Sequence, residues 1–494
     1  MQQNGFSYLC AVRKKKQIRI LQSVTVEDYA AEGRSLARVD GKVVFIEGAV
    51  PGDVVDVQLG KSKKDWAEGR AVHFHSYSTQ RTEPFCQHFG LCGGCKWQML
   101  PYAEQIKYKQ NEVEQNLKRI GRIELPPMLP IVGADTVKYY RNKLEFTFSS
   151  KKYLTREELL KRDAEREKQS QQPESNGVEE AGALGFHVPR IFDKAIDIET
   201  CYLQPEPSNA IRNFVRAFAK VHGLSFYNIK EHTGWLRTMI IRTSTTGEVM
   251  VNITMGFDDE ANRRLLFDAL LAAFPEITTL LYTINPKWND TIYDLTPQTY
   301  FGNGFITERL EDFVFKISPK SFFQTNTKQA EKLYRITRDF AKLTGKETLY
   351  DLYCGTGSIG IFCSKGAQKI IGVETVADAI EDAKENAALN HLRNTHFYAG
   401  DVIDICNDDF FAAHGRPDVL ITDPPRAGMH EKLVKKLLEI EAPRIVYVSC
   451  NVATQARDLQ LLNEKYNVEQ LQPVDLFPHT HHIENVAALV LRTV

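Results

Sequence analysis

This chain of 494 residues has no long apolar run and almost no net charge. No apolar run approaches the roughly 18 residues needed to cross a bilayer, so we expect no membrane span. The first six residues lack the apolar core of a signal peptide, which predicts a cytoplasmic protein. Net charge is −1, with 62 basic against 63 acidic residues. That balance disfavours nonspecific coating of nucleic acid by a wholly cationic surface, but it leaves room for local basic patches.

The remaining composition is that of an ordinary folded protein. Hydrophobic residues make up 43% and charged residues 25% of the chain. Its length exceeds what one core can organise and indicates about three domains. The nine cysteines, without an export signal, do not indicate a disulfide framework. Where they cluster, metal binding or catalysis is the better interpretation.

We divide the chain into four segments. Residues 1–78 contain short strand patterns broken by glycine turns, as in a small OB-like β-barrel. Residues 79–130 hold a cysteine cluster and a helical stretch. Residues 131–320 are β-rich and carry a charged insertion at 151–183, whose composition buries little and predicts a surface segment. Residues 321–494 alternate strand and helix patterns.

The last segment has the pattern of a doubly wound, mainly parallel α/β sheet. Helical patterns such as 377–389 separate its strand candidates, and this order predicts crossover connections. The strand candidates are 347–353, 369–373, 396–398, 419–422 and 444–448. In sheets of this kind, ligands bind at the C-terminal ends of the strands.

A glycine-rich loop follows the first of these strands and opens a helix. Its sequence is Gly355-Thr-Gly-Ser-Ile-Gly360. The glycines permit a tight turn and close approach to a nucleotide-type ligand. Glu374 stands 19 positions after Gly355 and ends the next strand, where a carboxylate can accept both hydroxyls of a ribose. NAD enzymes share this much of the pattern.

Other strand ends favour S-adenosylmethionine (SAM) over NAD. Asp351 precedes the glycines, and Asp423-Pro-Pro-Arg426 follows the fourth strand candidate. Asp401 follows the third strand candidate. For Asp401 a contact to adenine and an ordinary strand-end turn are equally good interpretations.

A cysteine and a glutamate complete a reactive set. Cys450, in Val448-Ser-Cys-Asn451, ends the last parallel strand candidate, and Glu484 ends a Pro- and His-rich stretch downstream. Carbon 5 of uracil is a poor nucleophile, but addition of a thiolate to carbon 6 makes it carbanion-like, so that it can attack the SAM methyl group. A base must then remove the carbon-5 proton. Taken singly, a buried cysteine is usually a small hydrophobe, yet the combination predicts pyrimidine chemistry.

A second group of cysteines lies upstream. Cys86, Cys92 and Cys95 form a C-x5-C-x2-C pattern, and Cys201 is the natural fourth member, 106 positions beyond Cys95. Thiolates suit zinc or an iron–sulfur cluster, and the spacing does not choose between them. His88 is an alternative ligand. The pattern differs from the C-x3-C-x2-C of radical SAM enzymes, which argues against a radical mechanism. We interpret the other cysteines as packing residues: Cys10, Cys354, Cys363 and Cys406.

Several motifs together resemble the RNA uracil-5-methyltransferase family, which includes RumA-like 23S rRNA enzymes and TrmA-like tRNA enzymes. They are Phe323-Gln-Thr-Asn326, Asp351-Leu-Tyr-Cys-Gly-Thr-Gly357, Asp423-Pro-Pro-Arg-Ala-Gly428, Ser449-Cys-Asn451 and His481-His-Ile-Glu484. The N-terminal strands resemble the TRAM domain, an OB-like RNA-binding module. The run Arg13–Lys16 strengthens an RNA interpretation, with a solvated tail as the alternative.

The resemblance implies roles for single residues. Cys450 would be the nucleophile and Glu484 the proton acceptor. The SAM-binding residues would be Gln324, Tyr353, Glu374 and Asp423. A [4Fe–4S] cluster is implied on Cys86, Cys92, Cys95 and Cys201, and such a cluster would point to the RumA-like branch.

Two positions near these motifs bear on a turn and on contact with RNA. Val452 stands where family members often carry Pro, a difference that affects a turn more than the chemistry. Phe322 or Phe323 is a candidate for stacking on RNA bases, with core packing as the alternative.

We therefore predict an α/β class I SAM-dependent methyltransferase domain, an N-terminal TRAM barrel and a β-rich middle domain with an iron–sulfur site. The predicted reaction is methylation of carbon 5 of a uridine in structured RNA, first 23S rRNA and second tRNA. We expect a monomer without a DNA or membrane partner. Two alternatives are a noncatalytic RNA-binding protein with a degenerate methyltransferase fold and a redox iron–sulfur protein. The first leaves Cys450 and Glu484 without a purpose, and the second leaves the glycine loop unexplained.

Overall fold

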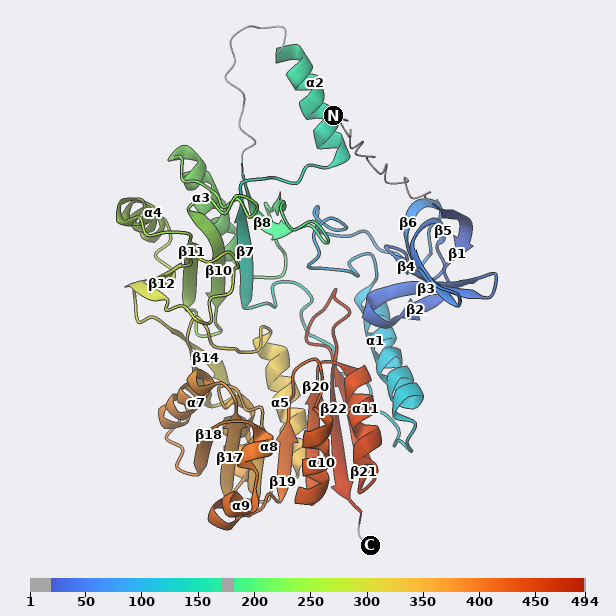
Figure 1. The fold of residues 1–494 in the computed structure, drawn as a ribbon, viewed down its shortest axis with the longest axis vertical. Coiled ribbons are helices and arrows are strands. Elements are labelled where there is room, and N and C mark those ends of the chain that lie inside the picture. Colours follow the sequence, from blue (N-terminus) through green and yellow to red (C-terminus); the bar gives the residue numbers. More distant parts are fainter. Residues whose placement is uncertain (1–18, 170–181, 493–494) are drawn as a thin grey trace, which may run out of the picture. The chain divides into compact units, whose positions relative to one another are not determined.

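The computed structural model describes residues 19–169 and 182–492 and divides the chain into two compact units (Figure 1). One unit runs to Glu83 and includes Met99–Pro101, and the other contains Pro84–Gln98 and the chain from Tyr102 onward. Cys10 and the basic run 13–16 lie outside the described residues.

The first unit is a six-stranded sheet that curls around a small apolar core (Figure 1). Its strand order is β1-β5-β6-β4-β3-β2, and β4 pairs with β6 in parallel. Alternate residues of β5, Val55 and Val57, are fully buried, as the period of a half-buried strand requires. The elements are β1 (Ile20–Thr25), β2 (Asp28–Ala30), η1 (Ala31–Gly33), β3 (Arg34–Val39), β4 (Lys42–Glu47), β5 (Val54–Ser62) and β6 (Trp66–Ser76).

The second unit begins with the cysteine segment and a helix. α1 (Tyr102–Asn116) continues into one π-helical turn, η2 (Leu117–Gly121), which packs against α11 (Val452–Leu462) of the C-terminal part. Val113 and Leu117 are fully buried within that apolar cluster. The helix expected near the cysteines therefore forms and belongs to the core of the C-terminal part.

A seven-stranded sheet forms the middle of the chain, in the order β13-β12-β11-β10-β7-β8-β9. Every residue of β10 and β11 is buried, and α4 supplies the crossover between the parallel pair β11 and β12. The elements are β7 (Lys143–Ser149), β8 (Ala183–His187), β9 (Ala195–Asp197), α3 (Ser208–Val221), β10 (Leu236–Thr243), β11 (Val249–Met255), α4 (Glu260–Ala273), β12 (Ile277–Ile284) and β13 (Gln298–Phe301).

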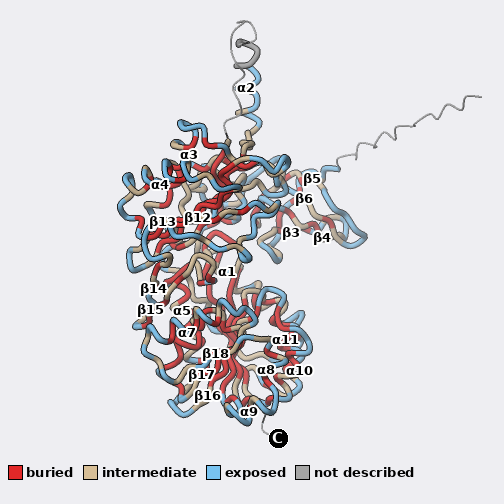
Figure 2. The backbone as a smooth tube through the Cα atoms, turned by 60° about the vertical axis from the view of Figure 1, so that its left-hand side comes forward, coloured by how far each residue is buried: buried red, intermediate tan, exposed pale blue. Residues whose placement is uncertain are grey.

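The charged insertion contains α2 (Arg156–Gln169), which follows β7. Most of the helix residues whose burial is described are exposed (Figure 2). Its acidic first turn, with Glu157 and Glu158, suits the positive end of the helix dipole. Residues 170–181 lie outside the described residues.

The C-terminal part has a seven-stranded sheet in the order β18-β17-β16-β19-β20-β22-β21. Its first five strands are parallel, while β22 runs antiparallel between β20 and β21. This is the predicted class I methyltransferase fold. The strands are β16 (Thr348–Leu352), β17 (Lys369–Glu374), β18 (Thr395–Ala399), β19 (Val419–Thr422), β20 (Arg444–Ser449), β21 (Tyr466–Val474) and β22 (Glu484–Leu491).

Helices and a hairpin surround this sheet and form two apolar clusters with it (Figure 2). The helices are α5 (Thr327–Ala341), α6 (Ser358–Cys363), η3 (Ser364–Gly366), α7 (Ala377–Leu389), α8 (Val402–Ile405), α9 (Asp408–His414), α10 (Glu431–Ile440) and α11. The hairpin of β14 (Ile306–Leu310) and β15 (Phe313–Ile317) packs on α7, where Asn386 and Asn390 accept its backbone N–H groups.

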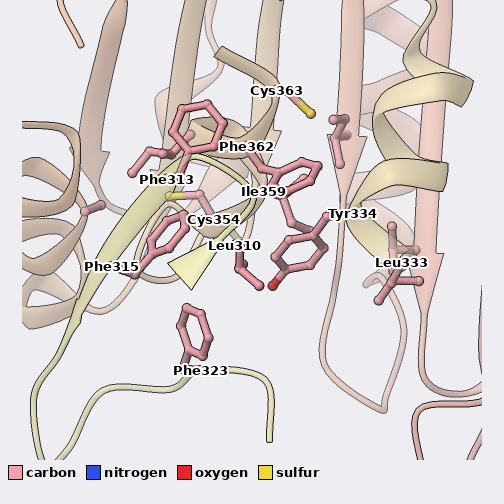
Figure 3. Close-up of a cluster of buried hydrophobic side chains, with 14 of the residues drawn as sticks. Leu310, Phe313, Phe315, Phe323, Leu333, Tyr334, Cys354, Ile359, Phe362 and Cys363 are labelled. Carbon is pink, nitrogen blue, oxygen red and sulfur yellow. The ribbon is translucent and has the colours of Figure 1, made fainter. Parts of the chain in front are cut away.

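Figure 3 shows one of these clusters, which contains Phe323 and two of the cysteines interpreted as packing residues. Phe323 is 4% exposed and packs against Phe315, so it is a core residue rather than a base-stacking one. Cys354 and Cys363 are buried in the same cluster, and Cys406 is buried in the other, as their interpretation as packing residues requires. Within residues 19–169 and 182–492, no helix is long and apolar enough to cross a membrane.

Candidate active site

The glycine loop turns sharply between β16 and α6. Tyr353, directly after the strand, has a positive φ of 61°, and Gly355 and Gly357 have φ values of 52° and 76°. A Cβ atom on Gly355 would meet no atom within 4 Å, so open space lies beside this residue. A Cβ atom on Gly357 would lie only 3.0 Å from the ring of Phe397. The first glycine thus borders a space for a ligand, and the second permits close packing.

Two carboxylates hold this loop. Glu374 Oε2 accepts a hydrogen bond from the N–H of Gly355 at 3.3 Å, while its Oε1 accepts one from Val376 at 3.0 Å. Asp351 is buried; its Oδ2 accepts from the N–H of Gly360 at 2.8 Å, and its Oδ1 has no partner. Burial raises the pKa of Asp351 to about 7. The open space, the loop amides and the unpartnered carboxylate oxygen fit a polar ligand such as SAM.

Asp401 has a local structural task. Its side chain caps α8 by accepting the N–H of Ile403 at 2.8 Å. Asp401 therefore forms an ordinary turn after β18, as one of its two interpretations requires. Contact between Asp401 and adenine stays a prediction.

Cys450 directly follows β20, and Glu484 is the first residue of the neighbouring strand β22. In the antiparallel pair of β20 and β22, Ser449 is opposite Asn485. Cys450 directly follows Ser449 and Glu484 directly precedes Asn485, so both residues lie at the same end of this ladder. The charge of Glu484 raises the pKa of Cys450, which requires that the two groups are near each other. Cys450 is partly accessible, whereas Glu484 is 5% exposed. A thiol and a carboxyl group from distant sequence positions therefore lie together at this sheet edge.

Asn451 fixes the loop that carries the thiol. Its side-chain oxygen caps α11 by accepting the N–H groups of Ala453 and Thr454. Its Nδ2 donates to the carbonyl of Arg426 at 3.0 Å, so the loop after β19 is tied to the loop after β20. Arg426 in turn donates to a ring nitrogen of His482 at 3.3 Å. Asn451 and the Arg426–His482 contact are features that sequence reasoning missed, although both lie in motifs that it quoted.

The acidic groups of this site disfavour one another's charges. Burial raises the pKa of Cys450 to about 11, with further increases from Glu484 and Asp423 and an opposing effect of Arg426. Burial also raises the pKa of Asp423 to about 7 and that of Glu484 well above its usual range. Because the three groups share one poorly solvated site, their neutral forms are favoured in the ligand-free protein. A cation bound there would stabilise the ionised carboxylates.

Gln324 lies on the segment before α5, beside two contrasting aromatics. Phe322 is 72% exposed, whereas Phe323 is in the core. The carbonyl of Gln324 accepts from Asn142 Nδ2 at 3.0 Å. Asn326 caps α5, and its Nδ2 donates to the carbonyl of Leu476 at 2.8 Å. This segment is thus anchored both to the middle of the chain and to the loop before Glu484.

The loop from Asp475 to Ile483 has supports that no sequence motif indicated. Lys109 of α1 makes an ion pair with Asp475 at 2.7 Å, and both side chains are fully buried. Tyr102 donates to the other oxygen of Asp475 at 2.8 Å. Gln105 accepts from the N–H of His479 at 2.8 Å, and burial lowers the pKa of His479 to about 4. A helix outside the catalytic sheet therefore holds the segment that leads to Glu484.

The upstream cysteines meet at one cavity. Cys86, Cys92, Cys95 and Cys201 all line a cavity of about 360 Å³. Burial raises the pKa of Cys92 to about 11 and that of Cys95 to about 12. His88 also lines the cavity, and its Nε2 accepts from the N–H of Glu199 at 3.3 Å. In the part of the chain that the structure describes, no group of three or more His, Cys, Asp or Glu residues is arranged to hold a metal ion. The cluster thus remains a prediction.

Comparison with known proteins places the chain in a family. The profile of the tRNA (uracil-5-)-methyltransferase family matches residues 297–492, and that of the TRAM domain matches residues 15–72. An uncharacterised RNA methyltransferase from Bacteroides thetaiotaomicron is 53% identical over 94% of this chain and 100% of the relative. Another from Porphyromonas gingivalis is 48% identical over 95% of this chain and 99% of the relative.

The chain belongs to the tRNA (uracil-5-)-methyltransferase family.

A solved structure supports this membership. The tRNA (uracil-54, C5)-methyltransferase of Pyrococcus abyssi, in complex with S-adenosyl-L-homocysteine, is 27% identical with a TM-score of 0.71. The similarity covers 95% of this chain and 100% of that one. The family resemblance predicted from the motifs is confirmed, and the protein is a SAM-dependent RNA (uracil-5-)-methyltransferase. The two alternatives, a noncatalytic RNA-binding protein and a redox iron–sulfur protein, are therefore set aside.

Proposed function

We propose that the protein methylates carbon 5 of a specific uridine in 23S rRNA through a covalent adduct between Cys450 and carbon 6 of the base. The observation that carries this proposal is the register of β20 and β22: the ladder ends at the pair Ser449 and Asn485, and Cys450 and Glu484 are the next residues on either side of that end. A nucleophile and a base on the same edge of the sheet suit addition at carbon 6 and proton removal at carbon 5.

The proposed reaction has three steps. The Cys450 thiol first loses its proton to water, which reaches this partly accessible side chain; the sulfur then adds to carbon 6, and electron density moves to carbon 5. Carbon 5 then forms a bond to the methyl carbon, and the electrons of the broken sulfur–methyl bond stay on sulfur as S-adenosylhomocysteine forms. Glu484 removes the carbon-5 proton, the double bond between carbons 5 and 6 returns, and the thiolate leaves.

The protonation states of the site follow from its burial. With a pKa of about 11, the Cys450 thiol keeps its proton at neutral pH in the ligand-free protein. Burial, followed by the charge of Asp423, raises the pKa of Glu484 well above its usual range, so the neutral form of Glu484 is favoured more than in an exposed glutamate. Carboxylates with raised pKa values are suited to a cationic ligand, which would favour their ionised forms. Loading of the donor pocket would therefore prepare Glu484 to accept a proton.

Four residues are proposed to hold the donor. When bound, SAM supplies an electrophilic methyl group on a positively charged sulfur. Glu374 would accept the ribose hydroxyls, as carboxylates at this strand end do in related folds. Tyr353 borders the loop, and Asp423 and Gln324 would contribute polar contacts at the ends of β19 and of the segment before α5.

We propose a [4Fe–4S] cluster on Cys86, Cys92, Cys95 and Cys201. The cavity that all four line supports it, since soft thiolate ligands suit iron as well as zinc. The cysteines would clip the segment before α1 to the middle of the chain. Lys96 and Trp97, directly after Cys95, donate their N–H groups to the carbonyl of His479 at 2.8 and 3.1 Å, so this clip would also steady the loop before Glu484.

A tRNA uridine is the second candidate target. The four-cysteine set favours the RumA-like 23S rRNA branch by resemblance. The similarity to the solved tRNA (uracil-54, C5)-methyltransferase of Pyrococcus abyssi favours tRNA. The reaction is the same for both targets, so only an assay with each RNA can distinguish 23S rRNA from tRNA.

Two experiments test the proposal. Purified protein is incubated with methyl-labelled SAM and either protein-free 23S rRNA or tRNA transcripts, and 5-methyluridine is mapped in the products. Transfer to 23S rRNA alone is expected, and transfer to tRNA alone would overturn the target. Transfer to neither would overturn the function.

The nucleophile is tested separately with RNA that carries 5-fluorouridine at the mapped position. Fluorine cannot leave as a proton, so the wild-type adduct should persist and migrate more slowly in a denaturing gel. Cys450→Ala should form none, whereas Cys406→Ala, which alters a cysteine away from the site, should behave like the wild type. A persistent adduct in Cys450→Ala would disprove the assignment.

A further inference from the structure

The loop after β12 exposes two large aromatic side chains. Trp288 and Tyr293 are each 76% exposed, which makes them the most exposed aromatic residues in the described part of the chain. Single exposed apolar residues are common on protein surfaces. Two large exposed aromatic side chains on one short loop can form a binding surface if the loop has a fixed conformation.

A buried arginine fixes this loop. Arg237, 2% exposed, donates to the carbonyls of Asn285 and Lys287 and, through its other terminal nitrogen, to the carbonyl of Asn289 at 2.9 Å. The same nitrogen donates to Asp290 Oδ1 at 2.7 Å. The backbone on both sides of Trp288 is therefore anchored to β10. Its conformation is set before any ligand arrives, which lowers the entropy cost of binding.

One face of the Trp288 ring is already used. His232 stacks on it, with ring centroids 4.8 Å apart and planes 9° from parallel. Since the side chain is still 76% exposed, most of its remaining surface is open to solvent. An indole held flat on one side and open on the other is suited to stacking with a planar partner.

The loop contacts the segment that carries the proposed donor-binding residue Gln324. Lys320 Nζ donates to the carbonyl of Tyr293 at 3.0 Å and lies 3.5 Å from a carboxylate oxygen of Asp378 in α7. Ser321 donates to Asp382 of the same helix at 2.5 Å. The aromatic loop is thus connected to the catalytic part through a short anchored segment.

We propose that Trp288 and Tyr293 form a stacking surface for unpaired bases that flank the target uridine of the RNA substrate. This inference rests on the proposed function. A uridine must leave its helix to reach the Cys450 thiol, which is only partly accessible, so its neighbours are unpaired or easily unstacked. Aromatic side chains bind such bases in a sequence-tolerant way, because every base has a π-face.

The test measures RNA binding by full-length protein. The probe is a fluorescently labelled RNA stem-loop with an unpaired, uridine-containing loop, compared with a blunt RNA duplex of equal length. Trp288→Ala and Tyr293→Ala should each weaken stem-loop binding about tenfold, the effect of losing one stacked base. Trp288→Phe should retain most of the affinity. Phe192→Ala, at an aromatic that is 64% exposed outside this loop, should bind like the wild type.

The outcomes separate this inference from the proposed function. Wild-type affinity in both alanine variants would overturn the stacking surface, whether or not the protein methylates RNA. Equal weakening for the stem-loop and the duplex would also overturn it, because a duplex offers no unstacked bases. Trp288-dependent stem-loop binding by a protein that transfers no methyl group would support the surface and overturn only the function. Thermal unfolding of each variant checks that the loop change leaves the fold intact.

Discussion

Lys109 Nζ lies 2.7 Å from Asp475 Oδ1, and neither side chain is exposed to solvent. The lysine comes from α1 and the aspartate from the residue directly after β21. Lys109 also donates to the carbonyl of Phe477 at 3.1 Å. This ion pair therefore joins a helix outside the sheet to the start of the loop that ends at Glu484.

Replacement of Lys109 by Met should destabilise the protein by about 3–5 kcal/mol, because it leaves the Asp475 carboxylate buried without its cation. Urea unfolding followed by fluorescence measures this loss. Lys107→Met is the matched control, since Lys107 is 69% exposed and its pair with Glu104 should contribute at most about 1 kcal/mol. If the pair positions the loop, kcat should fall more than KM for RNA changes. An equal free energy of unfolding in Lys109→Met and wild type would contradict the prediction.

Glu484→Gln should stall the reaction after methyl transfer. Glutamine keeps the shape of the side chain but cannot accept the carbon-5 proton, so the methylated RNA should stay bound to Cys450. We expect product release to fall by about 10²–10⁴-fold, the usual contribution of a general base. A labelled protein–RNA band in a denaturing gel would reveal the adduct, and the added change Cys450→Ala should remove it. Glu381→Gln, at a side chain that is 70% exposed, serves as the control. Normal turnover by Glu484→Gln would assign the base elsewhere.

Asp423 should make the ligand-free protein less stable as pH rises. Its pKa is about 7 in the folded protein, because of burial, and about 4 in an unfolded chain. Between these values the folded state holds a proton that the unfolded state has lost, so stability decreases from pH 4 to pH 7. The ceiling of this effect is about 4 kcal/mol.

Asp423→Asn removes that dependence, and its melting temperature should exceed that of the wild type by more at pH 8 than at pH 5. Asp408→Asn, at a side chain that is 95% exposed, should show no such difference between the two pH values. A wild-type advantage that grows with pH would mean that the Asp423 carboxylate is favoured in the fold.

Cys201→Ser should lower bound iron in protein purified without oxygen, as measured by metal analysis and by visible absorbance. The amides of Lys96 and Trp97 should then exchange hydrogen faster, because their acceptor, His479, would be less firmly held against them. Cys406→Ala, at a buried cysteine that does not line the cavity, should retain iron. Unchanged iron content in Cys201→Ser would rule out Cys201 as a ligand.

The parts of the fold that were predictable from the sequence are those encoded locally. The glycine loop after β16 and the carboxylate that ends β17 occupy strand ends, and parallel topology brings such ends to one edge. The strand and helix patterns of this region also appear in the structure close to their expected bounds.

Other features depend on contacts between distant positions. Lys109 and Asp475 are 366 positions apart, and neither lies in a pattern that indicates burial or pairing. Phe322 and Phe323 are adjacent in an irregular segment without periodicity, so only tertiary packing decides that one is exposed and the other buried. The antiparallel insertion of β22 likewise follows no local signal.

The pairing of β20 with β22 has a consequence for how the chain can vary. There are 33 residues between Cys450 and Glu484, including all of α11 and β21. Because the ladder between the two strands sets the separation of thiol and carboxyl, the turn between α11 and β21 can lengthen or shorten without moving the reactive pair. A slip of β22 by one residue would instead turn Glu484 to the opposite face of the sheet. The chain thus tolerates a change of length at this turn, but not a change in the alignment of the two strands.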